Sequence, residues 1–198
     1  WDYYKKPWSE VKQDIIFHRL PLLVVDNQIE IWQSNAISRY IAKITNNIPD
    51  NKEMAAYADS IFESAHDLFF PLNPTINVFV GENHLNHKKN LIEEILPKAF
   101  GNFEKLLQKY KGNFFLGDQV FYCDFNVYHH LSLALLLENT ILDNYPKLKQ
   151  FIINFEALEG IKNYLNSRAE LTGIGTWPKV VIDGKEYTSG TNPSYKYL

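Results

Sequence analysis

An apolar run near the start of the chain predicts a β-hairpin. Residues 20–25 are apolar and partly β-branched, and Asp26 and Asn27 then end the run with residues that favour tight turns. Residues 28–32 are predicted to form the return strand. Beyond them, apolar residues recur at the spacing of one helix face, at Ala36, Ile37, Tyr40, Ile41 and Ile44. Ser34 precedes this pattern and is predicted to cap the helix.

The rest of the chain has a different pattern. The polar residues 46–51 break the helical spacing and are predicted to form a linker. Apolar residues three and four apart then predict helices at 52–70, 84–110, 122–138, 145–154 and 158–168. Gly, Pro and Thr are frequent after residue 173, around a predicted strand pair at 179–182 and 186–188 that Asp183 and Gly184 would join. We therefore expect domains at 1–46 and 52–170 and an appended tail at 171–198.

Composition and charge exclude several classes of protein. The 198 residues include 45% hydrophobic and 15% aromatic residues, so the chain is predicted to be globular rather than disordered. A net charge of -3 argues against nucleic acid or an anionic membrane as partner. With Cys123 as the only cysteine, an intramolecular disulfide is impossible, and a cytoplasmic location is the default expectation. The longest apolar stretch, residues 131–137, is too short to span a bilayer.

Four short motifs carry a resemblance to a known family. They are Trp8 with Lys12, Arg19-Leu20-Pro21, the string QSNAISRY from Gln33 to Tyr40, and Asp124-Phe125. Together they resemble the glutathione transferases, and in particular the sigma-like, prostaglandin D synthase type branch. The resemblance covers about residues 8–168. It implies two domains: an incomplete thioredoxin-like α/β domain, without its first strand and helix, followed by an all-α helical bundle.

The resemblance also implies a site for glutathione, an extended tripeptide with two carboxylates and one α-amine. A cis Pro21 would turn the backbone N–H and C=O of Leu20 outward to pair with the cysteinyl residue. Gln33 and Ser34, where a strand enters a helix, would bind the γ-glutamyl carboxylate.

Further residues would complete this site. The indole of Trp8 and the ammonium of Lys12, four residues apart, would hold the glycyl carboxylate. Asp67 would reach across a homodimer interface to the α-amine. The implied co-substrate is glutathione, the implied partner is a small hydrophobic electrophile, and no metal is expected.

Each of these residues also has a simpler explanation. Ser34 alone could be a helix cap, Lys12 a surface lysine and Trp8 a core aromatic. Asp67 could belong with Glu63 to an exposed acidic stripe. The residues Phe69, Phe70 and Pro71 could line a pocket for the electrophile or belong to the core. The histidine pairs His84/His87 and His129/His130 lack a third ligand, so packing or surface roles are expected for them.

No residue of this chain is expected to activate the thiol. In sigma-like members a tyrosine hydroxyl on the first strand does this by favouring the thiolate. Trp8 lies too near the start for that strand and helix to precede it, and Tyr3 and Tyr4 belong by register to the second strand or the loop after it. The chain as given should therefore hold glutathione weakly and not activate it. The alternative function is a non-catalytic relative, a structural or interaction protein.

Two local features complete the predictions. Family members carry Ser or Thr three residues before the aspartate equivalent to Asp124, which forms a capping box, but this chain has Phe121 there. One reciprocal hydrogen bond should be missing, at a cost of about 1 kcal/mol unless Gln119 or water replaces it. Residues 177–184 echo residues 20–27, and we interpret them as a short surface hairpin rather than as a second glutathione-binding module.

Overall fold

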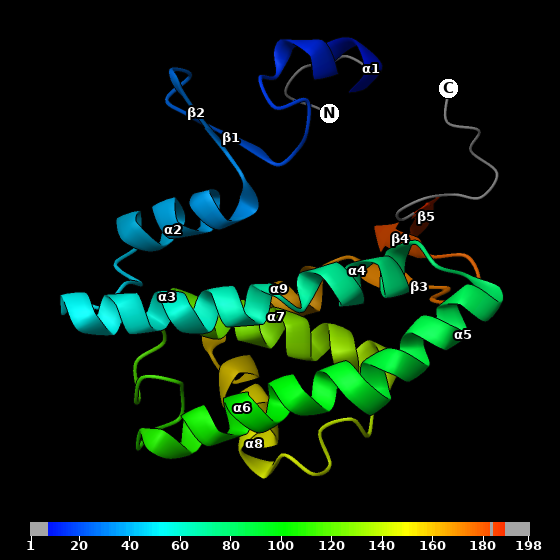
Figure 1. Cartoon of the computed structure of the whole chain (residues 1–198). Helices are drawn as coiled ribbons and strands as arrows, with labels where there is room; N and C mark the ends of the chain where they lie inside the picture. The colour runs from blue at the N-terminus through cyan, green and yellow to red at the C-terminus, as the bar shows by residue number, and fades with distance from the viewer. Residues whose placement is uncertain (1–7, 183, 189–198) are drawn as a thin grey trace. The chain divides into compact units, whose positions relative to one another are not determined.

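The computed structural model describes residues 8–182 and 184–188. The chain divides into two compact units, Trp1–Ile48 and Pro49–Leu198. Figure 1 labels their helices and strands. No helix in the described ranges combines the length and the apolar character that crossing a membrane requires.

The first unit contains the predicted hairpin and helix. Its elements in chain order are the helix α1 (Trp8–Val11), the 3-10 turn η1 (Lys12–Asp14), the strands β1 (Leu22–Val25) and β2 (Ile29–Trp32), and the helix α2 (Ser34–Ile44). The strands pair antiparallel, with Leu22 opposite Trp32 and Val25 opposite Ile29. Both Asp26 and Asn27 have positive φ, 51° and 55°, as a turn that follows the twist of a hairpin requires. Helix α2 packs against both strands.

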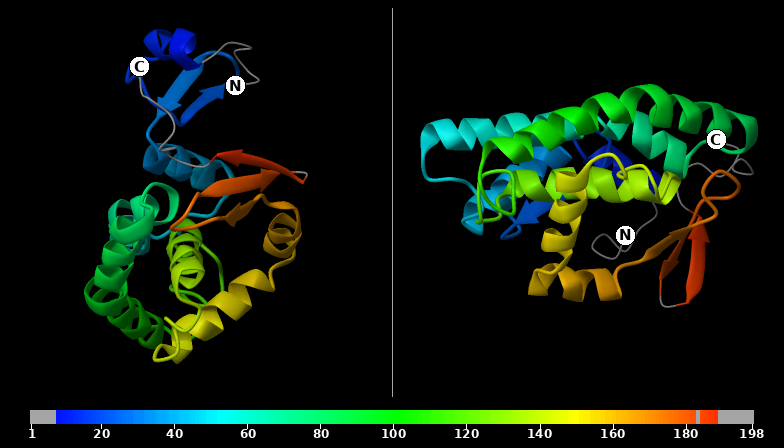
Figure 2. Two further views of the ribbon diagram at one scale, coloured as in Figure 1. Left: turned by 90° about the vertical axis from the view of Figure 1, so that its right-hand side faces the viewer. Right: turned by 90° about the horizontal axis from the view of Figure 1, so that it is seen from below.

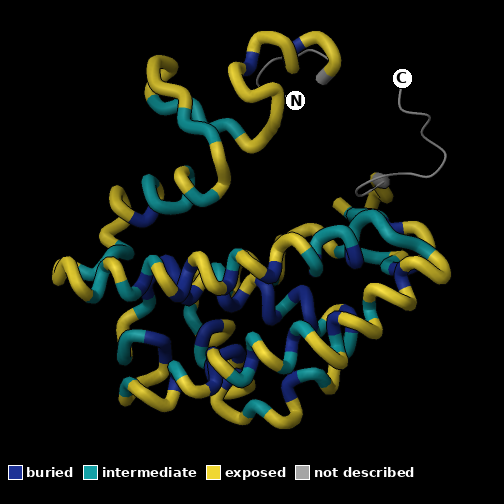
Figure 3. Tube along the Cα trace, viewed as in Figure 1, coloured by how far each residue is buried: buried dark blue, intermediate teal, exposed yellow. Residues whose placement is uncertain are grey.

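Helices make up most of the second unit. They are α3 (Lys52–His66), α4 (Phe69–Asn77), α5 (Gly81–Asn90), the π-helical turn η2 (Leu91–Ile95), α6 (Leu96–Lys109), α7 (Tyr122–Leu137), α8 (Pro146–Glu156) and α9 (Glu159–Ser167). Helix α7 packs against α3 and α4, while α8 packs against α6 and α9. Because α7 is apolar on nearly all sides, most of its residues are buried. Figure 3 shows the buried positions along α7 and on the neighbouring α3.

The predicted helix 52–70 is wrong in its extent. Helix α3 ends at His66, and α4 begins at Phe69 after a short turn. No helix was predicted over residues 71–77, where Pro71 and Pro74 stand. Pro71 lies in the first turn of α4, where its missing N–H is not needed, and Pro74 lies inside the helix. The helices predicted at 122–138, 145–154 and 158–168 agree with α7, α8 and α9 to within two residues.

The end of the described chain forms a small antiparallel sheet in the second unit. The expected strand pair is present as β4 (Lys179–Ile182) and β5 (Lys185–Thr188), and β3 (Glu170–Thr172), which was not predicted, pairs with β4. Asp183, at the predicted turn, lies outside the described residues. Figure 2 shows this sheet following α9. The loop between β3 and β4 is tied to the start of α5, where the Gly81 N–H donates to the Gly175 carbonyl at 2.8 Å.

Candidate functional site

The junction of β2 and α2 positions Gln33 and Ser34. Gln33 precedes α2 with φ 72°, a left-handed value that is uncommon for a residue other than glycine and is often found at binding sites. Ser34 is the first helical residue rather than the cap, so the predicted capping role of Ser34 is wrong. Among the described residues the exposed Ser34 hydroxyl has no hydrogen-bond partner. The hydroxyl therefore stays available to an anion at the positive end of a helix.

The segment before β1 presents Leu20 and Pro21. The peptide bond between them is cis, as the resemblance implied. Leu20 is 52% exposed, and the ladder between β1 and β2 begins only at Leu22. Within the described part of the chain, the Leu20 N–H and C=O form no hydrogen bond. This backbone can therefore pair with an extended peptide in the manner of an added strand.

Lys12 lies at the start of η1 with an exposed side chain. Its carbonyl accepts hydrogen bonds from the Ile15 N–H at 3.4 Å and from the His18 ring at 3.0 Å. Trp8 begins α1, and its side chain lies outside the described part of the structure. Tyr3 and Tyr4 also lie outside the described residues.

Asp67 belongs to the second unit, directly after the last turn of α3. It is exposed, and its N–H donates to the Glu63 carbonyl at 3.0 Å. The C-terminal end of a helix carries partial negative charge, so a carboxylate there adds to the local attraction for a cation. An ammonium group is the kind of ligand that this position favours.

An aromatic patch of His66, Phe69 and Phe70 lies beside Asp67. The rings of His66 and Phe69 stack at 5.5 Å between centroids, and Phe70 meets both edge-on. Phe69 is 38% and Phe70 70% exposed, so the interpretation of these two residues as core is wrong. Neither of them lines the cavity between α7 and α9.

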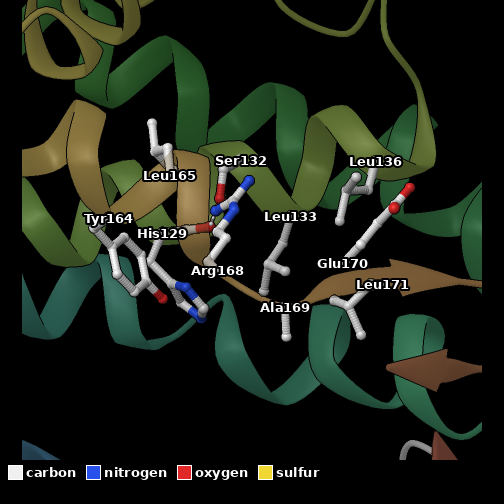
Figure 4. Close-up of a pocket in the computed structure, with 10 residues that line it drawn as sticks. All are labelled: His129, Ser132, Leu133, Leu136, Tyr164, Leu165, Arg168, Ala169, Glu170 and Leu171. Atoms are coloured by element: carbon white, nitrogen blue, oxygen red, sulfur yellow. Dashed lines mark hydrogen bonds between the residues drawn. The ribbon is translucent and has the colours of Figure 1, made fainter. Parts of the chain in front are cut away.

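A cavity of about 490 Å³ lies between α7, α9 and the start of β3 (Figure 4). Its apolar wall includes Leu133, Leu136 and Leu165, while His129 and Arg168 are among its polar groups. Burial and the nearby Arg168 charge lower the pKa of His129. None of the residues predicted to bind glutathione lines this cavity. Sequence reasoning missed it because its walls come from segments about 35 residues apart, and no motif marks those positions.

The histidines make packing contacts. The His84 Nδ1 lies 2.8 Å from the Thr75 carbonyl, and His87 stacks on Phe79 at 4.1 Å. His130 bonds the Asn126 carbonyl through Nδ1, and burial lowers the pKa of His130 to about 4. Within residues 8–182 and 184–188, no three His, Cys, Asp or Glu side chains are grouped so that they could hold a metal ion.

The start of α7 depends on the buried carboxylate of Asp124. Its two oxygens accept hydrogen bonds from the Phe121 N–H at 2.8 Å and the Phe115 N–H at 3.0 Å. The phenyl ring of Phe121 cannot accept a bond in return, and the Asp124 N–H donates instead to the Phe121 carbonyl at 3.0 Å. Burial raises the pKa of Asp124 to about 6. The predicted absence of a side-chain acceptor at residue 121 is thus confirmed, and the Phe121 carbonyl accepts from the Asp124 N–H.

Cys123 is poorly suited to act as a nucleophile. It is fully buried in α7, and burial raises the pKa of its thiol well above the ordinary value. A neutral buried thiol is a poor nucleophile.

The described residues thus form an α/β unit with a cis peptide bond before Pro21 and an exposed serine at the start of α2, and a mostly helical unit follows it. Residues 66–168 match the family model described as "Glutathione S-transferase, C-terminal domain". The chain belongs to the glutathione S-transferase family, which is a family of transferase enzymes. The expected fold class, a thioredoxin-like unit followed by a helical unit, is confirmed, and the second unit also contains the small sheet of β3, β4 and β5.

Individual relatives support this assignment. The chain is 30% identical over 181 residues to "Glutathione S-transferase P" of Caenorhabditis elegans, covering 90% of this chain and 82% of the relative. It is 34% identical over 168 residues to "Glutathione S-transferase Mu 5" of Mus musculus, covering 84% and 72%. The solved Pi-class glutathione S-transferase of Onchocerca volvulus superposes with a TM-score of 0.74 at 30% identity, covering 83% of this chain and 77% of that one. These names are of the Pi and Mu classes and give no specific support to the sigma-like branch.

Proposed function

We propose that this protein joins the thiol of reduced glutathione to small hydrophobic electrophiles. The proposal is supported by relatives that are named glutathione S-transferases. The observation that carries it is the Ser34 hydroxyl, which begins α2 without capping it and so remains unpaired among the described residues. A serine hydroxyl whose only role was to cap the helix would accept a hydrogen bond from a backbone N–H of its first turn.

The proposed binding mode divides the tripeptide among three places. Gln33 and Ser34 bind the γ-glutamyl carboxylate at the start of α2. The Leu20 backbone, just before β1 and next to Pro21, pairs with the cysteinyl N–H and C=O. Lys12, together with Trp8, binds the glycyl carboxylate through an ammonium and an indole N–H.

Asp67 is proposed to bind the α-amine of glutathione held by a second copy of the chain. This proposal requires a homodimer whose two-fold axis brings the end of α3 from one protomer to the site of its partner. The position of Asp67 at the negative end of a helix supports it, because a protonated amine is favoured there.

In the proposed reaction, the cysteinyl thiol loses its proton to solvent and the thiolate attacks the electrophilic carbon. A carbon–sulfur bond forms, and the leaving group departs with the electron pair of its bond. We assign activation of the thiol to a tyrosine hydroxyl on a first strand, as the resemblance implied, and to no described residue. The isomerising activity and the sigma-like branch remain predictions.

Titration of glutathione into the full-length protein tests the site. In a Ser34→Ala variant the dissociation constant should rise about 5- to 150-fold, because a hydrogen bond to a charged group contributes about 1 to 3 kcal/mol. Ser38→Ala, one turn later in α2, is the matched control and should bind like the wild type. An unchanged dissociation constant in Ser34→Ala would remove Gln33 and Ser34 from the proposed site.

A further inference from the structure

His18 links two parts of the proposed glutathione site, and no motif in the sequence singled it out. Its Nδ1 lies 3.0 Å from the carbonyl oxygen of Lys12, six residues earlier. Its own N–H donates to the Ile15 carbonyl at 2.8 Å. Along the chain it stands immediately before Arg19 and Leu20. One residue therefore connects the turn that carries Lys12 to the segment that presents the Leu20 backbone.

The chemistry of the contact fixes the state of the ring. A carbonyl oxygen can only accept a hydrogen bond, so the His18 Nδ1 must carry the proton and donate it. The backbone of His18 adopts φ 50°, a left-handed value that is strained for a residue other than glycine. In this conformation the imidazole ring points back toward η1 and forms a hydrogen bond with the Lys12 carbonyl. Among the described residues, loss of the ring would leave the Lys12 carbonyl with only the long bond of 3.4 Å from the Ile15 N–H.

We propose that His18 is a positioning residue for the glycyl end of glutathione. It acts through Lys12: by fixing the Lys12 carbonyl it orders the turn from which the Lys12 ammonium reaches the glycyl carboxylate. The inference rests on the proposed function, because it assigns Lys12 to that carboxylate. It predicts an effect confined to ligands that carry a glycyl carboxylate.

The test uses variants that keep the backbone conformation of His18. Glycine accepts φ 50° without strain, and so to a large extent does asparagine, whose side-chain N–H₂ lies where the histidine Nδ1 lies. In the full-length protein, His18→Gly should raise the dissociation constant for glutathione about three- to tenfold, while His18→Asn should restore it to near the wild-type value. In His18→Asp the new side chain has the shape of asparagine but no hydrogen-bond donor, so this variant should also bind glutathione more weakly. It provides a second way to remove the donor if His18→Gly folds poorly.

A second ligand separates positioning from a general effect on the fold. γ-Glutamylcysteine lacks the glycine, so its affinity should be the same in the wild type and in His18→Gly. In a Lys12→Ala background, adding His18→Gly should not change glutathione affinity further, because the residue through which His18 acts is absent. Equal glutathione binding by His18→Gly and wild type, or an equal loss for both ligands, would overturn the inference. A wild-type protein that binds neither ligand would instead overturn the proposed function.

Discussion

Replacement of Asp124 by asparagine should change the pH dependence of folding in a defined direction. The carboxyl is fully buried, and its pKa in the folded protein is about 6 against an ordinary value of 3.8. A raised pKa means that folding favours the protonated form. The contribution of Asp124 to stability is therefore full below about pH 4 and is lost as the pH rises through about 6. Since one pKa unit corresponds to 1.36 kcal/mol, the whole change is about 3 kcal/mol.

Urea unfolding at a series of pH values measures this change. Asparagine does not titrate, so the free energy of unfolding of the wild type minus that of Asp124→Asn should fall by about 2 kcal/mol between about pH 4.5 and pH 7.5. Asp118→Asn removes an exposed carboxylate of the preceding loop, whose Oδ1 accepts the Asn113 N–H, and corrects for the general loss of one charge. A difference that stays constant or grows with pH would refute the reasoning. It would mean that the hydrogen bonds from Phe121 and Phe115 outweigh the cost of burying the charge.

Two further predictions concern the tail and the assembly. Gly175→Ala should lower the free energy of unfolding by about 2 to 4 kcal/mol in denaturant titrations, because its Cβ would lie 2.6 Å from the buried His84 ring at φ 79°. Gly160→Ala, where the new Cβ meets nothing within 4 Å, should leave stability unchanged or raise it slightly; an equal loss in both variants would contradict the packing argument. Light scattering should give the native protein twice its monomer mass at micromolar concentration. Only monomer with glutathione still bound would exclude Asp67 from the site.

Local patterns predicted the local structure well. The hairpin followed from two residues, Asp26 and Asn27, that tolerate positive φ, and α7 followed from a long apolar segment that begins at an aspartate. The break between α3 and α4 was not predicted, because nothing in the polarity of Asp67 distinguishes a helix end from a helix interior. Composition could not show that α4 continues through Pro74, since packing against α7 and α5 supports a helix that a proline weakens.

Only those residues of the candidate site that belong to sequence motifs could be predicted. Gln33, Ser34, Leu20 and Lys12 were found because they stand in a recognisable register, and their roles remain proposals. The N-cap of α2 is Gln33, with a left-handed backbone, rather than Ser34. Residue preferences at helix caps favour serine over glutamine and so did not indicate this. The contact between His18 and Lys12 depends on a positive φ at a histidine, and sequence reasoning has no signal for that.

The backbone at Gln33 has a consequence for how this position evolves. Glycine would adopt φ 72° without strain, so selection for stability alone would favour glycine there. A glutamine at such a position is conformationally strained. In return, the protein keeps a side-chain amide there and a fixed direction in which the chain enters α2. In a family of variants screened only for thermal resistance, this residue should be among the first replaced. With Gln33 in the role proposed for it, such a screen would enrich stable proteins that had lost affinity for glutathione.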